Sequence, residues 1–171
     1  MTVYVTAETT HTVSVIDTIA LKVISTILVG SRPRAAAFTP DGKQAYITSE
    51  IGSVVSVIDT KTNKVIDSIK IEKKDKQIKP MGVIVSPDGK HVYVATGRGN
   101  LVAIIDTSTN TVISYIPVGM RVWGVALTTD GKKLYTANGI SNDVSVINTE
   151  TEKVVATIST GKGPWGIAIE K

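Results

Sequence analysis

The sequence predicts an all-β protein built from repeated four-stranded sheets, and three observations lead to this fold class. Short apolar runs rich in valine, isoleucine and tyrosine have the length of strands, and none shows a sustained helical period. Turn residues separate these runs about every ten positions. The pattern of runs and turns then recurs along the chain at a nearly fixed spacing.

The repeat has a period of 42 residues with one insertion. The strand tyrosines Tyr4, Tyr46, Tyr93 and Tyr135 are separated by 42, 47 and 42 residues, and the longer gap falls in the charged stretch 71–79. We therefore expect a single domain, 1–171, that contains four repeats. Their approximate bounds are 1–34 (completed by 165–171), 35–81, 82–123 and 124–164.

Four strands are expected in each repeat, as the third repeat illustrates. The run 82–85 (Gly-Val-Ile-Val) is continuously apolar, which is typical of a strand covered on both faces. The runs 91–95 and 101–105 are rich in β-branched residues and are expected to be the second and third strands. The run 111–115 mixes polar and apolar residues, as expected of an outer strand.

Two kinds of turn join these strands. In the Pro-Asp-Gly turns at 40–42 and 87–89, proline fixes φ and glycine takes the site of positive φ. Between the third and fourth strands, Asp59 and Asp106 begin turns in which the carboxylate can accept backbone N–H groups. These aspartates are therefore assigned a structural role rather than a catalytic one.

Repeats of this length with four antiparallel strands are typical of β-propeller blades. The segments 3–6 (Val-Tyr-Val-Thr), 55–60 and 163–168 (Gly-Pro-Trp-Gly-Ile-Ala), together with the Pro-Asp-Gly-Lys turns, resemble the YVTN family of propeller repeats. The last two repeats are most similar to the propeller proteins associated with pyrroloquinoline-quinone-dependent catabolism. The resemblance covers essentially the whole chain. It implies extracytoplasmic proteins, some of which accompany quinoprotein oxidation systems, so an acidic electron carrier or dehydrogenase is one candidate partner.

The phase of the repeats bears on how a ring would close. The chain begins with the second strand of a blade and ends, at 166–169, with a first strand, so the end supplies what the beginning lacks. Glycine and alanine in the first strands suit a seven- or eight-bladed ring, in which the angle between neighbouring blades is small and little space has to be filled. The preferred hypothesis is a homodimer in which two chains form an eight-bladed ring. The alternatives are a four-bladed ring within one chain and an excised half-propeller.

Composition excludes several classes of protein. The chain has no cysteine, which excludes disulfides, thiolate nucleophiles and zinc fingers. No apolar run approaches the roughly 20 residues that span a bilayer, so no membrane span is expected. The two histidines fall at opposite ends of the blades, and no metal or cofactor is predicted. No signal peptide is recognised, and the compartment is left open, although the resemblance implies a periplasmic or secreted protein.

One face of the predicted propeller, which we call the channel face, collects the candidate binding residues. Loops from strand four to strand one and from strand two to strand three emerge there around the axis. All four arginines of the chain fall in these loops, and guanidinium groups suit carboxylates and phosphates better than ammonium groups do. Two tryptophans, one lysine and one histidine accompany them. The candidate site residues are Arg32, Arg34, Arg98, Arg121, Lys162, Trp123, Trp165 and His11.

Each candidate also has a structural interpretation. The arginines could form ion pairs between blades with Glu8, Glu50 or Asp143, and the tryptophans could pack between blades. His11 as a lone ligand or base is weakly supported, because no cluster of histidines and carboxylates accompanies it.

The function predicted is a non-enzymatic binding or interaction scaffold whose channel face takes an anionic small molecule or an acidic protein. The net charge of +4 agrees with such partners, whereas nucleic acid is not favoured because no aromatic residues are interleaved with the lysines of 70–79. The alternatives are a propeller enzyme or enzyme subunit, lactonase-like or quinoprotein-associated, and an excised or engineered array of repeats without a site of its own.

Overall fold

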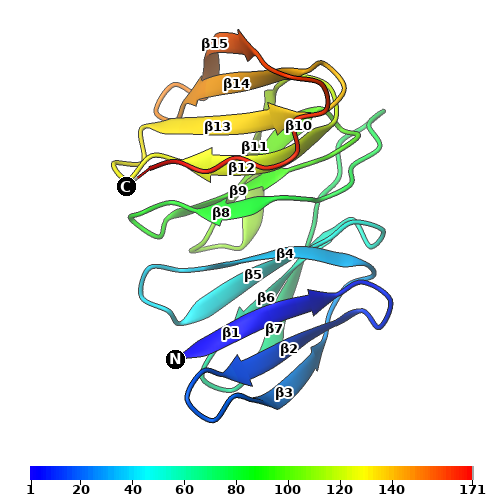
Figure 1. The fold of residues 1–171 in the computed structure, drawn as a ribbon, viewed down its shortest axis with the longest axis vertical. Coiled ribbons are helices and arrows are strands. Elements are labelled where there is room, and N and C mark those ends of the chain that lie inside the picture. Colours follow the sequence, from blue (N-terminus) through cyan, green and yellow to red (C-terminus); the bar gives the residue numbers. More distant parts are fainter. Residues whose placement is uncertain (171) are drawn as a thin grey trace.

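A computed structural model describes residues 1–170 as four antiparallel sheets, with fifteen strands and no helix among these residues (Figure 1). Each sheet is a meander in which strands that follow one another in the sequence are hydrogen-bonded neighbours. The all-β fold predicted from the repeat is confirmed. No helix within 1–170 is long and apolar enough to cross a membrane.

We call the four sheets blades 1 to 4. Blade 1 has three strands and the others have four. The strands are β1 (Thr2–Ala7), β2 (Thr12–Asp17) and β3 (Lys22–Leu28) in blade 1; β4 (Pro33–Phe38), β5 (Gln44–Ser49), β6 (Val54–Asp59) and β7 (Lys64–Lys70) in blade 2; β8 (Val83–Val85), β9 (His91–Ala95), β10 (Leu101–Asp106) and β11 (Thr111–Pro117) in blade 3; β12 (Val122–Leu127), β13 (Lys133–Asn138), β14 (Asp143–Asn148) and β15 (Lys153–Ser159) in blade 4.

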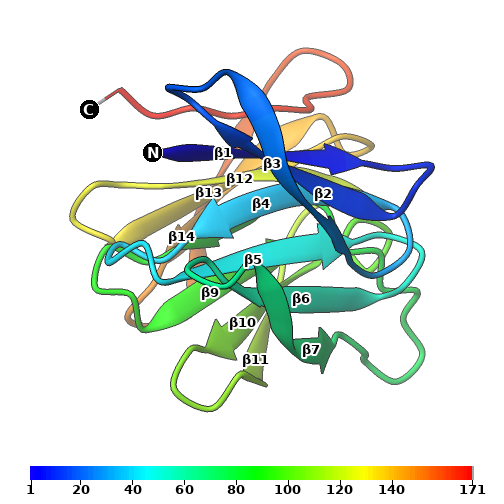
Figure 2. The ribbon, with the colours of Figure 1, turned by 90° about the horizontal axis from the view of Figure 1, so that it is seen from below.

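The first strands of blades 2 to 4 lie next to one another and approach closely. A Cβ added at Gly82 in the segment before β8 would lie 2.7 Å from the carbonyl oxygen of Trp123, and one added at Gly124 would lie 2.8 Å from that of Trp165. Glycine is needed at both positions because the neighbouring group is backbone, which has little room to move. Figure 2 views the molecule from below, with the inner strands β4 and β12 higher in the picture than the outer strands β7 and β11.

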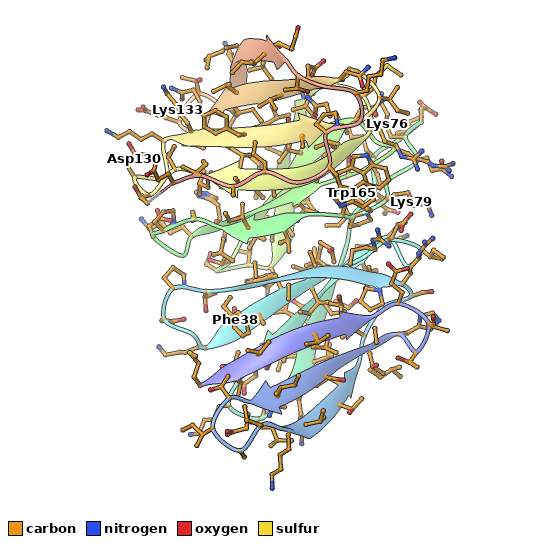
Figure 3. All side chains as sticks on the ribbon, viewed as in Figure 1. Phe38, Lys76, Lys79, Asp130, Lys133 and Trp165 are labelled. Atoms are coloured by element: carbon orange, nitrogen blue, oxygen red, sulfur yellow. The ribbon has the colours of Figure 1, made fainter. Side chains whose placement is uncertain are left out.

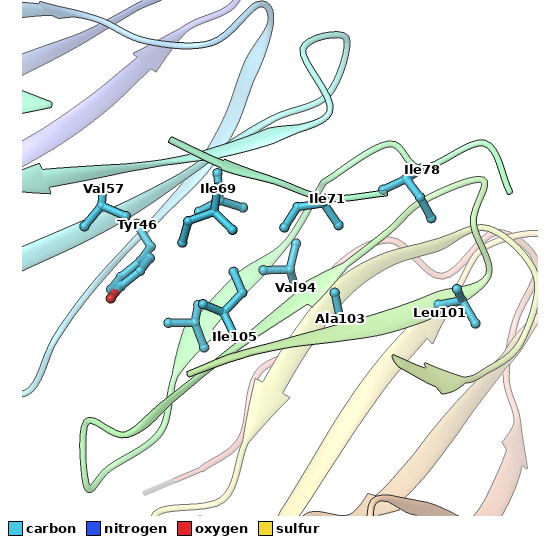
Figure 4. Packing of buried hydrophobic residues seen from close by; sticks show 11 residues of the cluster. Tyr46, Val57, Ile69, Ile71, Ile78, Val94, Leu101, Ala103 and Ile105 are labelled. Carbon is cyan, nitrogen blue, oxygen red and sulfur yellow. The ribbon is translucent and has the colours of Figure 1, made fainter. Parts of the chain in front are cut away.

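The hydrophobic core lies between the blades. Tyr46, Val57 and Ile69 of blade 2 pack with Val94 and Ile105 of blade 3, and the same repeat positions form the neighbouring clusters (Figure 4). All but Ile69 in this group are completely buried, and Ile69 is 6% exposed. Each blade therefore covers the apolar face of the next one, and stability depends on these boundaries.

A tyrosine hydroxyl also ties each of the first two blades to the blade that follows. Tyr4 donates to Oδ1 of Asn63 over 3.0 Å, and Tyr46 donates to Oδ1 of Asn110 over 3.0 Å. The two asparagines have positive φ values of 54° and 53°, which asparagine tolerates better than most residues. Burial, aided by the charges of Asp67 and Asp106, raises the pKa of Tyr46 to about 12.

The turn aspartates have the structural role expected of them. Asp59 accepts a hydrogen bond from the backbone N–H of Thr62 over 2.7 Å, and Asp106 accepts one from that of Ser108 over 2.8 Å. In the turns that join the first and second strands, Asp41 accepts from the hydroxyl of Thr39 over 2.7 Å and from the backbone N–H of Lys43. These hydrogen bonds favour the charged carboxylate.

We expect Asp41 to titrate far below an ordinary aspartate. The hydroxyl of Thr39, followed by the N–H of Lys43, lowers its pKa from 3.8 to about 2. The stabilisation is therefore present above about pH 4, where the unfolded carboxyl is ionised, and is lost as the pH falls through 2. An NMR titration of the carboxyl carbon would measure this. Thr39→Ala should raise the pKa, and a value unchanged by that substitution would contradict the assigned cause.

Within the described residues, the C-terminal segment does not pair with β1. The two ends of the chain lie in different parts of the molecule in Figure 1, and residues 160–170 form no strand. The segment instead lies beside β12, where Trp165 and Gly166 approach Gly124 in the way that Trp123 and Gly124 approach Gly82. It thus continues the series of inner strands outward. Residues 1–170 therefore do not form a closed four-bladed ring.

Candidate functional site

The channel face carries the predicted site residues, but the structure divides them into two groups. Figure 3 places Lys76, Lys79 and Trp165 at one end of the blades, and Asp130 and Lys133 at the opposite end. The first end is the channel face. Its N-terminal half belongs to blades 1 and 2, and its C-terminal half belongs to blades 3 and 4 and the C-terminal segment.

The arginines of the N-terminal half are neutralised. Arg32 Nε lies 3.0 Å from Glu8 Oε2 and 3.4 Å from Glu50 Oε2. Arg34 contacts Glu8 Oε1 and lies 3.7 Å from Glu50 Oε2. The hydrogen bond that Arg32 donates to Glu8, followed by the charge of Glu50, raises the pKa of Arg32. For these two arginines the structure shows the ion-pair alternative, and the network joins blade 1 to blade 2.

His11 braces a loop of the same half. Its Nδ1 lies 2.9 Å from the carbonyl oxygen of Glu8 and 3.2 Å from the backbone nitrogen of Arg32. The residue has a φ of 59°, as does Arg32. Depending on the tautomer, Nδ1 donates to the Glu8 carbonyl within its own loop or accepts from the Arg32 N–H of the neighbouring loop. The His11 side chain also lines a shallow pocket with Thr9 and Ile51.

Planar groups dominate the C-terminal half. The rings of Trp123 and Trp165 are stacked, with centroids 4.0 Å apart and planes 26° apart. The Cζ atom of Arg121 lies 4.8 Å from the centroid of the Trp123 ring, which is a cation–π contact. The Arg121 backbone N–H donates to Asn100 Oδ1 over 2.8 Å, so the loop that carries the guanidinium is held by blade 3. Trp165 remains 55% exposed.

Gly139 makes room for this stack. A Cβ at Gly139 would lie 2.6 Å from Trp123 Cδ1 and would come still closer to Nε1. The equivalent positions of the repeat hold Glu8, Glu50 and Gly97. At this repeat position, the glutamates of blades 1 and 2 thus pair with Arg32 and Arg34. In blade 4, Gly139 leaves space for the ring of Trp123. Sequence reasoning did not identify Gly139, although this Glu-Glu-Gly-Gly column was visible in the repeat.

The cations of the C-terminal half have no carboxylate partner within 1–170. Arg98 donates to Gln77 Oε1 over 3.3 Å, and no ion pair in the described part of the chain includes Arg98, Arg121 or Lys162. Arg98 and Lys162 are exposed. On the channel face these three residues, like Lys76 and Lys79, therefore carry positive charge that no carboxylate of residues 1–170 neutralises.

A groove of about 350 Å³ runs along the inner strands between the two halves. Arg34 and Glu8 line it on the N-terminal side, and Trp123 and Trp165 line it on the C-terminal side. The rest of its lining comes from the inner-strand segments and includes small residues (Ala35, Gly82, Gly124 and Gly166) and larger apolar ones (Met81, Val83, Val125 and Ile167). Among residues 1–170, no three histidine or carboxylate side chains gather closely enough to hold a metal ion.

The meandering blades, the glycine-lined inner strands and the groove between them define a β-propeller. A family model described as Lactonase, 7-bladed beta-propeller matches residues 2–169, and the chain belongs to this family. No curated protein matches the sequence. Of the solved structures, the hydrazine synthase of Kuenenia stuttgartiensis is similar to this chain, with 28% sequence identity and a TM-score of 0.86.

The match covers 92% of this chain but only 45% of the hydrazine synthase chain, so this chain spans less than half of that relative. The predicted propeller fold is thus confirmed at the level of family and structure. The narrower resemblance to YVTN repeats and to quinone-associated propellers stays a prediction.

Proposed function

We propose that the chain is a non-enzymatic binding scaffold that holds an anionic ligand or an acidic protein segment on the C-terminal half of its channel face. One observation carries the proposal. The carboxylates of Glu8 and Glu50 neutralise the arginines of blades 1 and 2, whereas Arg98, Arg121 and Lys162 have no such partner within residues 1–170. Arg121 contacts the ring of Trp123, on which the exposed ring of Trp165 stacks, so positive charge lies close to this aromatic surface.

The chemistry of this half suits a flat acid. The exposed face of Trp165 offers an aromatic surface at the edge of the groove, and planar rings stack favourably on such a surface. A carboxylate on the same molecule finds guanidinium and ammonium groups nearby, with which it forms charge-assisted hydrogen bonds. An acidic protein partner, such as the electron carrier that the sequence resemblance implies, would offer the same combination of carboxylates and apolar side chains.

We expect Arg121→Gln to weaken the binding of 2-naphthoate by about tenfold, because a hydrogen bond to a charged group contributes about 1.5–3 kcal/mol. The two tryptophans of the chain both lie at the site, so quenching of intrinsic fluorescence would measure the affinity. Binding should also weaken as salt is added.

Arg32→Gln is the matched control, because Arg32 occupies the same repeat position as Arg121 but is already paired with Glu8 and Glu50. It should change the affinity less than twofold. Equal effects of the two substitutions, or equally strong binding of a naphthyl ammonium cation, would overturn the proposal.

A lactonase activity is the second candidate, and the family match supports it. The groove is large enough for a small ring, and His11 is the histidine of the channel face. The test is the hydrolysis of γ- and δ-lactones followed in a pH-stat. If lactone hydrolysis were lost in His11→Ala but kept in His91→Ala, the chain would be an enzyme and the scaffold proposal would be wrong.

The proposal includes self-association into a homodimer. Blade 1 has one strand fewer than the other blades, and its β1 pairs only with β2 among the described residues. An unpaired edge of this kind favours the addition of a strand from another chain. The mass of the particle in solution, measured by light scattering over a range of concentrations, tests this part of the proposal.

A further inference from the structure

The connection between blades 2 and 3 is longer than the repeat requires. Tyr46 and Tyr93 are 47 residues apart, against 42 for the other successive strand tyrosines, so five residues are inserted. They fall in the stretch 71–79, which we call the insertion loop. Blades 1 and 2, and blades 3 and 4, bury their shared clusters without such an insertion. The packing of the blades therefore does not explain it.

The insertion loop is held by contacts near both of its ends. Ile71 is completely buried and Ile78 is 5% exposed, and both belong to the cluster between blades 2 and 3 (Figure 4). Between them, the hydroxyl of Tyr115 on β11 donates to the carbonyl oxygen of Glu72 over 2.7 Å. The Nζ atom of Lys73 lies 5.0 Å from the centroid of the same ring, which is a cation–π contact. The loop therefore presents its charges from a fixed backbone, which lowers the entropic cost of binding.

The loop 97–100 of blade 3, which we call the glycine loop, accommodates the insertion loop. A Cβ at Gly97 would lie 2.7 Å from the carbonyl oxygen of Lys79, whose backbone N–H donates to the carbonyl oxygen of Thr96 over 2.9 Å. The next residue, Arg98, donates to the Oε1 atom of Gln77 over 3.3 Å. The guanidinium of Arg98 is thus held beside the insertion loop.

The glycine loop also joins the insertion loop to the stacked tryptophans. Its Asn100 Oδ1 accepts the backbone N–H of Arg121 over 2.8 Å, and its Gly97 forms an isolated β-bridge with Val122. Arg121 in turn contacts the ring of Trp123. The insertion loop, the glycine loop and the tryptophan stack are therefore contiguous on the channel face.

Positive charge predominates along this surface. Residues 70–79 contain five lysines but two carboxylates, and one of these carboxylates, that of Glu72, is already paired with a lysine. Neither Lys76 nor Lys79 takes part in an ion pair within the described residues. Figure 3 places both lysines at the same end of the blades as Trp165. The cations of three neighbouring loops thus form one basic surface that extends beyond the tryptophan stack.

On the basis of the proposed function, we infer that the partner is an extended acidic segment of a protein, and that the insertion loop is its second point of contact. An apolar side chain of the segment lies on Trp165, and its carboxylates reach Arg121, Arg98 and the lysines of the insertion loop. A small acid with one carboxylate uses that charge beside the tryptophans and has none left for the insertion loop. Nucleic acid is less suited, because the ring of Tyr115 beside the insertion loop already contacts Lys73 and is not free to stack on a base.

Two probes separate this inference from the proposed function. One is 2-naphthoate, which has a single carboxylate, and the other is an acetylated hexaglutamate peptide that ends in phenylalanine; calorimetry would measure the binding of each. Lys76→Gln combined with Lys79→Gln should weaken peptide binding about threefold to tenfold, the effect of losing two exposed ion pairs, and should change the affinity for 2-naphthoate less than about twofold.

Lys132→Gln combined with Lys133→Gln is the matched control. It removes the same net charge, but Lys133 lies at the opposite end of the blades (Figure 3). Both of these lysines are exposed. The affinity for the peptide should stay within about twofold of the original value, because charges farther apart than the Debye length are largely screened.

The outcomes distinguish the two proposals. Binding of 2-naphthoate without binding of the peptide would overturn the inference alone, and so would equal losses of peptide affinity in the two double variants. Failure to bind either probe would overturn the proposed function and the inference together. If an oligothymidylate of the same charge bound more tightly than the peptide, the basic surface would be assigned to nucleic acid and the inference would be wrong.

Discussion

Gly139→Ala is expected to separate the two tryptophan rings and to lower the free energy of unfolding by about 1–3 kcal/mol, the range for overpacking. The added methyl group would overlap the indole of Trp123, which contacts Arg121 and stacks on Trp165. The ring has to leave the stack, and the binding surface proposed for anions is lost with it. Circular dichroism of the coupled indoles and urea denaturation would measure the two effects.

Gly161→Ala is the control for this substitution. A Cβ at Gly161 would meet no atom within 4 Å, and the residue lies on the same face of the molecule. It should leave both the indole signal and the unfolding midpoint almost unchanged. If the two alanine variants behaved alike, the space left by Gly139 would not explain the tryptophan stack. The alternation of glutamate and glycine at this repeat position would then not explain why the two halves of the channel face differ.

Ile105→Ala is expected to lower the free energy of unfolding by about 2–5 kcal/mol. Ile105 on β10 is completely buried in the cluster between blades 2 and 3, where Tyr46 and Val57 of the preceding blade cover it (Figure 4). Loss of its side chain leaves a cavity at a boundary, and a propeller blade has little other apolar surface to compensate. Urea denaturation followed by circular dichroism at 215–220 nm would measure the change.

Ile113→Ala provides the comparison, because Ile113 lies on the outer strand β11 of the same blade and is 51% exposed. It should change the free energy of unfolding by about 0.5 kcal/mol or less. A similar loss in the two variants would mean that the boundaries between blades do not determine stability.

The fold could be predicted from the sequence because the same pattern of strands and turns occurs in each repeat, so that each repeat supports the assignment of the others. The tyrosines and turn aspartates of each repeat occupy matching positions, and the structure gives them matching contacts, such as those of Tyr4 with Asn63 and Tyr46 with Asn110. The closure of the ring could not be predicted with the same evidence. It depends on the turn angle per blade and on which chain supplies a strand, and neither is a local property of the repeat.

The candidate site was predicted only in part. The repeat positions of the arginines place them on one face of the molecule. Whether each arginine forms an ion pair depends on contacts between residues distant in the sequence, such as that of Arg34 with Glu8. Four arginines on one face therefore do not make one site. The stacking of Trp123 on Trp165 was also beyond sequence reasoning, because it requires the space left by Gly139.

The close spacing of the inner strands has a consequence for the size of the ring. Gly82 and Gly124 keep neighbouring inner strands near one another, and this spacing contributes to the curvature from one blade to the next. These glycines therefore help to decide how many blades fit around the axis.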